Sequence, residues 1–125
     1  MNELSIEELL ENIVLEDNRY SVDAYHFVRE GLDFTVKSLR SPRHVNGGEL
    51  LNGIREYALE EYCPMAKRVL AEWGITCCTD IGCIVFNLVN AGLLGKTEDD
   101  SLEDFEKGYD FNDAFLQPYR PVKTH

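Results

Sequence analysis

The sequence predicts a mainly α-helical domain of five to six helices, with a winged-helix-like second half and a possible small β-hairpin. Apolar residues recur at spacings of three and four along most of the chain. Cap residues precede these stretches, and glycine or proline follows them. The length of 125 residues suits one domain. We expect an acidic N-terminal helix in residues 1–20, a compact body in 21–113 and a loosely held tail in 114–125.

Two helices are expected before the first proline. The stretch Ser5-Ile-Glu-Glu8 has the capping-box pattern, which predicts a helix from about Ile6 to Glu16. Ser21 is the expected cap of a second helix, which reaches about Leu39 and ends before Pro42. Its apolar residues predict a buried stripe on one face of this helix. They are Tyr25, Val28, Leu32, Val36 and Leu39, with Phe27 and Phe34 beside them.

Two further helices follow this proline. Asn46-Gly-Gly-Glu49 predicts a capped helix over roughly Gly47 to Tyr62. Pro64 suits the first turn of a short helix that reaches Trp73, and Gly74 is a typical left-handed stop. The expected inward residues are Leu50 or Leu51, Ile54, Tyr57, Ala58 and Tyr62 in the longer helix, and Met65, Val69, Leu70 and Trp73 in the shorter one.

The winged-helix prediction rests on residues 75–111. A short strand is expected at Ile75-Thr76-Cys77, followed by a helix that Thr79 caps and Gly92 closes. Five apolar residues of that helix fall at i, i+3, i+4, i+7 and i+8. They are Ile81, Ile84, Val85, Leu88 and Val89. The stretch LVNAGLLGKTEDDSLEDF, which begins at Leu88, is typical of a recognition helix and wing. The aromatic residues at 105, 109 and 111 suit a hairpin or an irregular tail.

The charge is acidic and concentrated near the ends of the chain. The formal net charge is -11, with six acids and no base in residues 1–17 and eight acids with two lysines in residues 96–113. Such a surface repels nucleic-acid phosphates and anionic membranes. No apolar run has transmembrane length, and the N-terminus is acidic where a signal peptide would be basic. The cytoplasm is the expected compartment.

Charge also decides between two classes of function. In a DNA-binding winged helix, the fifth helix would enter the major groove with basic or amide side chains. This helix offers Asp80 there, and the expected wing over residues 97–104 is acidic. A non-enzymatic protein-interaction module is therefore favoured over a nucleic-acid-associated regulator, with contacts near Arg43 or in the acidic loop near Asp100. The partner-binding candidates are Arg40, Arg43, His44, Arg55, Lys67 and Arg68.

The cysteines and histidines of the chain suggest a third hypothesis, an enzyme that uses a thiol or a histidine. Cys77 or Cys78 precedes the fifth helix, whose N-terminus would lower a thiol pKa, and His26 or His44 is the available base. The pattern C-C-x4-C, with Cys63 upstream, lacks the paired spacing of a zinc site, and the acids of residues 98–104 lack that of a calcium loop. We therefore predict no metal or cofactor and free cysteines, which a reducing compartment favours.

One polar edge of the second helix is a further candidate site. His26, Arg29, Asp33 and Lys37 recur at i, i+3, i+7 and i+11. This edge is either a binding stripe, an acid/base pair or a solvated face with helical ion pairs, and the last is favoured.

Three stretches of the sequence carry a family resemblance. They are AYHFVREGLDFTV at 24–36, and RHVNGGELLNGIREYALEEY at 43–62 together with DIGCIVFNLVNAGLLGKTEDDSLEDFEKGYDF at 80–111. The chain resembles a family of small hypothetical bacterial proteins, known chiefly from planctomycetes and verrucomicrobia. The resemblance implies one compact cytoplasmic domain and carries over no activity, cofactor or catalytic residue, so it leaves the function open. It also implies a glycine where this chain has Cys63, which weakens any metal site that needs all four cysteines.

Overall fold

The fold is mainly α. The computed structural model describes residues 5–39, 45–94, 105 and 108–116. This part contains five α-helices, two short helical segments and no strand. The helices are α1 (Ile6–Glu16), α2 (Val22–Lys37), α3 (Gly47–Tyr62), α4 (Ala66–Glu72) and α5 (Cys78–Asn90), and the short segments are η1 (Cys63–Met65) and η2 (Asn112–Leu116). Every helix among the described residues is too short or too polar to cross a bilayer.

The predicted helix starts are confirmed where a side chain caps them. Ser5 Oγ accepts a hydrogen bond from the backbone nitrogen of Glu8 at 3.2 Å. At α3, Asn46 Oδ1 accepts from the Glu49 nitrogen at 2.8 Å, and the Glu49 carboxylate accepts from the Asn46 nitrogen at 3.3 Å, which completes a capping box. Ser21 is the N-cap of α2 by position, although its side chain makes no cap hydrogen bond.

Glycine ends α4 and α5 in the same way. Gly74 and Gly92 have φ of 96° and 79°, a conformation that glycine adopts without strain. The next residues, Ile75 and Leu93, donate their backbone N–H groups to carbonyls five residues back, at 2.9 Å in both cases. These are Schellman motifs, so each glycine fixes the direction in which the chain leaves its helix.

The second half differs from the winged-helix prediction. Ile75, Thr76 and Cys77 form no strand, because the Ile75 N–H belongs to the C-cap of α4 and no extended partner lies among the described residues. The side chain of Ile75 is buried, which explains its strand-like character. The cap of α5 is Cys77 and not Thr79. The expected hairpin is also wrong for the described residues, since Phe105 and residues 111–116 are helical. The wing over 97–104 lies outside the described residues.

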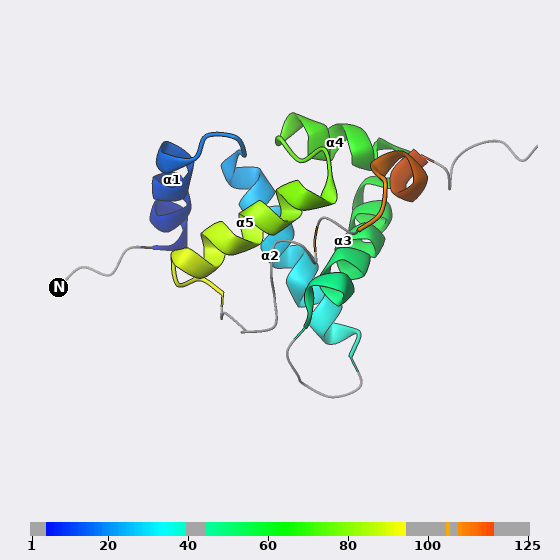
Figure 1. Ribbon diagram of the computed structural model, residues 1–125, viewed down its shortest axis with the longest axis horizontal. Coiled ribbons are helices and arrows are strands. Elements are labelled where there is room, and N and C mark those ends of the chain that lie inside the picture. The colour runs from blue at the N-terminus through cyan, green and yellow to red at the C-terminus, as the bar shows by residue number, and fades with distance from the viewer. Residues whose placement is uncertain (1–4, 40–44, 95–104, 106–107, 117–125) are drawn as a thin grey trace, which may run out of the picture.

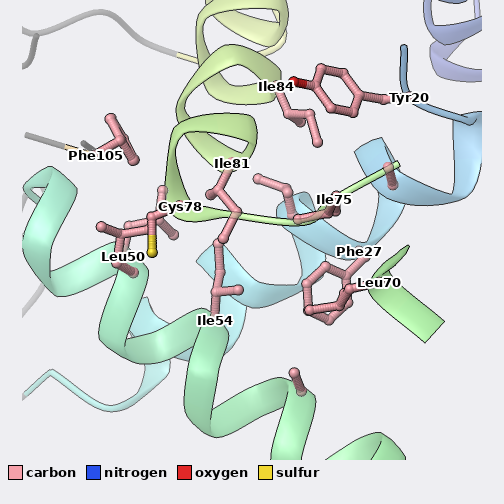
Figure 2. Close-up of a cluster of buried hydrophobic side chains, with 14 of the residues drawn as sticks. Tyr20, Phe27, Leu50, Ile54, Leu70, Ile75, Cys78, Ile81, Ile84 and Phe105 are labelled. Atoms are coloured by element: carbon pink, nitrogen blue, oxygen red, sulfur yellow. The ribbon is translucent and has the colours of Figure 1, made fainter. Parts of the chain in front are cut away.

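Helices α2 and α3 form the centre of the domain. They share the most extensive helix–helix contact, and α5 crosses α2 with α1 on one side and α3 on the other (Figure 1). In the core, Ile54 of α3 and Ile81 of α5 point toward one another (Figure 2). Their side chains are fully buried, as are those of Phe27, Leu70, Ile84 and Leu88.

Several large apolar residues are exposed, and the periodicity places two of them, Val36 and Met65, inside. Ile6, Val36 and Met65 have 42%, 37% and 49% of their surface accessible. In α2, the side that carries Ala24, Val28, Gly31 and Thr35 is buried, which leaves Val36 at the rim. The expected stripe is therefore rotated about the helix axis toward smaller residues.

The segment after α5 returns to the core. Phe105, Phe111 and Phe115 are at most 5% exposed. The Tyr109 hydroxyl donates to the Leu51 carbonyl at 2.7 Å, which joins this segment to α3. Ala114 and Phe115, the first residues of the predicted tail, are buried too. These aromatic side chains therefore close one side of the core.

Candidate functional site

A groove of about 450 Å³ lies along α2, opposite the residues that follow α5. The Schellman turn at Gly92 carries the chain from α5 to the leucines that form one wall. Eight residues line the groove: His26, Arg29, Glu30, Leu32, Asp33, Val36, Leu93 and Leu94. The groove thus brings three residues of the predicted polar edge of α2 together with four apolar side chains.

The charged groups of this groove differ in whether they are already paired. His26 Nε2 lies 2.6 Å from Glu7 Oε1 of α1, and Lys37 Nζ lies 3.0 Å from Asp33 Oδ2 one turn away. Glu30 accepts a hydrogen bond from the Tyr57 hydroxyl at 2.9 Å. Arg29 makes no ion pair or hydrogen bond with any described residue. Its guanidinium is therefore the cation that the groove offers to a ligand.

Part of the polar edge of α2 is therefore a solvated face with a helical ion pair, which is the interpretation that the sequence favours. The pair between Asp33 and Lys37 has i,i+4 spacing, and both side chains are largely exposed. Such pairs contribute about 0.3–0.5 kcal/mol to helix stability. Neither residue is therefore a strong candidate for acid/base chemistry.

The predicted basic partner-binding residues are described only in part. Arg55 lies on α3, and Lys67 and Arg68 lie on α4. None of the three has an ion pair within the part of the chain that the structure covers. Arg40, Arg43 and His44, and the acidic loop near Asp100, lie outside the described residues.

Two polar side chains of α5, Asp80 and Asn87, are occupied by internal hydrogen bonds. Asp80 accepts from the Tyr20 hydroxyl at 2.6 Å and from the Thr76 backbone nitrogen at 2.9 Å. The Asn87 amide donates to Asp17 Oδ2 at 3.1 Å and to the Tyr25 hydroxyl at 3.0 Å. As recognition-helix positions, Asp80 and Asn87 would have to break these bonds in order to reach a base edge.

The carboxyl of Asp80 is held in its charged form. Burial raises its pKa, but hydrogen bonds from Tyr20, Thr76 and Cys77 outweigh burial and keep the pKa below its ordinary value. The carboxylate also lies in the first turn of α5, where a negative charge is favourable. Sequence inspection identifies Asp80 only as an obstacle to phosphate, because its partner Tyr20 is 60 residues away.

The thiols have different environments. Cys78 is 4% exposed and donates a hydrogen bond to the Tyr109 carbonyl at 3.3 Å. Burial raises its pKa to about 11, whereas a helix N-terminus alone was expected to lower it. Cys77 is exposed and donates to Asp80 Oδ2 at 3.5 Å. Cys78 is therefore a poor nucleophile near neutral pH.

The expected bases do not complete a thiol site. His26 lines the same groove as Leu93 and Leu94, which follow the C-terminal end of α5, whereas Cys77 and Cys78 stand at the N-terminal end of that helix. His44 lies outside the described residues. Within the residues described, no three His, Cys, Asp or Glu side chains converge as metal ligands would.

Comparisons with known proteins leave the functional assignment to this geometry. No protein-family model, no curated protein and no solved structure matches the chain. The family resemblance of residues 24–36, 43–62 and 80–111 stays a prediction.

Proposed function

We propose that this protein is a non-enzymatic interaction module that binds a segment of another protein in the groove along α2. The observation that carries the proposal is that Arg29, which has no ion pair or hydrogen bond with a described residue, meets four apolar side chains in one hollow. The apolar residues are Leu32 and Val36 from α2 and Leu93 and Leu94 from the turn after α5.

The chemistry of the groove defines the segment that fits it. Its volume of about 450 Å³ is in the range of ligand sites, and apolar walls favour large apolar side chains. Arg29 favours a carboxylate, because an arginine–carboxylate pair is a charge-assisted hydrogen bond with defined geometry. The expected occupant is therefore a short partner segment with apolar side chains and one acidic side chain.

The other sequence-based hypotheses stay proposals of lower rank. A winged-helix regulator would use α5 as its recognition helix, where Asp80 and Asn87 are already bonded. A thiol or histidine enzyme would need a base near Cys77, and His26 lies at the other end of α5. An interaction module in the cytoplasm needs neither arrangement.

The test is selection of peptides from a random displayed library on the complete chain. We expect selected peptides to share an acidic residue next to large apolar residues. The consensus peptide should shift the backbone amide NMR resonances of α2 and of residues 93–94. Arg29→Gln should lower the affinity for this peptide by about tenfold, which is the usual effect of losing one charged hydrogen bond.

Arg68→Gln is the matched control, because it removes the same charge from the exposed surface of α4. We expect it to change the affinity by less than about twofold. If Arg68→Gln abolished binding and Arg29→Gln had no effect, the groove would not be the binding site. The basic residues of α3 and α4 would then be favoured as the site. A selection that enriches no sequence, or resonance shifts confined to other helices, would also refute the proposal.

A further inference from the structure

A row of five aromatic side chains lies on the side of α2 that faces α3. The ring centroids are 5.5 Å apart for Phe34 and Tyr57, 5.6 Å for Tyr57 and Phe27, 6.1 Å for Phe27 and Tyr62, and 5.8 Å for Tyr62 and Trp73. Phe27 is the buried member of the row, and the other four side chains are partly exposed. The row therefore presents an aromatic surface that no described helix covers completely.

Carboxylates flank this aromatic row. Asp23 and Glu30 of α2 and Glu61 of α3 are exposed. None of them has a basic partner among the described residues. Glu30 accepts a hydrogen bond from Tyr57, so one carboxylate is fixed at the edge of a ring. Negative charge is thus gathered on the row without a cation of the described chain to balance it.

The tyrosines respond to this negative field. Burial raises the pKa of Tyr62, and the charges of Glu30, Glu61 and Asp23 raise it further. Burial and the bond to Glu30 raise the pKa of Tyr57 in the same direction. Ionisation is disfavoured because it would add a further negative charge beside these carboxylates. The same field attracts a positive charge from outside.

Aromatic faces and carboxylates favour the same kind of ligand group. The face of an aromatic ring carries partial negative charge and attracts ammonium and guanidinium groups. Tyr62 and Trp73 meet at an interplanar angle of 81°, so their rings form two walls of a corner. A lysine or arginine side chain can lay its apolar stem on such rings and place its charged end beside Glu30 or Glu61.

We propose that the aromatic row is a docking surface for a lysine- or arginine-bearing segment of a partner protein. The net charge of -11 steers such a segment toward the molecule before contact. The carboxylates and rings then fix its position at short range. Glu30 also lines the groove, but this proposal does not rest on groove binding, because its ligand has the opposite charge and lies on rings of α2, α3 and Trp73 that do not line the groove.

The probe is a blocked tetralysine peptide, titrated into the complete protein. Trp73 is the single tryptophan of the chain, so its fluorescence reports on the row directly. We expect saturable quenching or enhancement of Trp73 emission, together with NMR shifts in residues 57–62. Glu61→Gln keeps the shape of the side chain and removes its charge. This variant should lower the affinity for the peptide by about fivefold. The double variant, Glu30→Gln with Glu61→Gln, should lower it by more than tenfold.

Two controls separate a site from general charge attraction. Glu11→Gln makes the same charge change on α1, at the opposite end of the molecule from α3 (Figure 1), and should leave the affinity within about twofold. Tyr62→Phe keeps the ring and should bind as the wild type does, whereas Tyr62→Leu should lose several-fold. Equal losses in all three glutamine variants, or shifts centred on α1, would overturn the proposal. The glutamine variants keep it falsifiable if Tyr62→Leu fails to fold.

Discussion

The side chain of Thr35 on α2 lies directly against the α carbon of Gly53 on α3. Thr35 is 4% exposed, and its hydroxyl donates to the Gly31 carbonyl at 2.7 Å, so its orientation is fixed within its own helix. A β carbon at position 53 would overlap Thr35 Oγ1 and lie 2.7 Å from Thr35 Cβ. Glycine therefore allows the two central helices to approach at this point.

Gly53→Ala should destabilise the protein by about 2 kcal/mol. Overpacking a fixed interface costs roughly 1–3 kcal/mol, and this exceeds the gain of up to about 1 kcal/mol in helix propensity. Urea unfolding followed by circular dichroism measures the difference. Gly48→Ala is the matched control, because a β carbon there meets only Asn46 Oδ1 at 3.5 Å. A Gly53→Ala variant as stable as Gly48→Ala would show that α2 and α3 can separate without cost.

Cys63→Gly should stabilise the protein by about 1 kcal/mol. Cys63 has φ of 50° and ψ of -133°, a backbone conformation that side chains with a β carbon rarely adopt. Such strain costs about 1–3 kcal/mol, and the entropy that glycine loses on folding offsets part of the gain. Thermal unfolding would show the increase. Cys63→Ser keeps the β carbon and should bring no gain, so equal stabilisation by serine would point to the thiol and not the backbone.

Asp80→Asn should destabilise the protein by about 2 kcal/mol at pH 7, because charged hydrogen bonds contribute roughly 1.5–3 kcal/mol. The pKa of Asp80 is lowered in the folded protein. Its charge therefore contributes stability above the unfolded pKa of about 4, and this contribution is lost as the pH falls through the folded pKa. Urea unfolding between pH 7 and pH 3 should show the two proteins converging in acid. A difference independent of pH would contradict a role for the charge.

Cys78 should be the last cysteine to react with iodoacetamide. Its pKa of about 11 leaves only about one thiolate in a thousand at pH 8, and its side chain is buried. Cys63 and Cys77 are exposed and should react first. Cys83 is half-buried and should react after these two and before Cys78. Peptide mass spectrometry of timed samples gives the order. Modification of Cys78 as rapid as that of Cys63 would contradict the protection of this thiol by burial and would support the thiol-enzyme hypothesis.

Local signals predicted the helices well. The bounds of α1 and α3 agree with the sequence prediction because Ser5 and Asn46 act on residues three positions away. The stops at Gly74 and Gly92 are local for the same reason. The polar edge of α2 was visible as well, since its period is that of one helix. Each of these features depends on neighbours within one turn.

Features that join distant segments of the chain could not be predicted from the sequence. The strand expected at Ile75 does not form. The side chain of Ile75 is buried and its backbone N–H bonds to the C-terminal end of α4, so neither needs a partner strand. Leu93 and Leu94 form a groove wall only because the turn at Gly92 brings them to α2. The bond from Tyr20 to Asp80 and the row from Phe34 to Trp73 both link different helices. No periodicity within a single helix encodes such pairs.

The C-terminal aromatic residues also set when the fold can be completed during synthesis. Protein chains are made from the N-terminus, and α2 and α3 are adjacent in sequence, so their pairing can form early. Leu51 and Cys78 receive their covering residue Tyr109 only 58 and 31 positions later. Until residue 115 has been made, the nascent chain exposes this apolar surface. This surface is therefore protected from proteases and chaperones only after Tyr109 and Phe115 have been made.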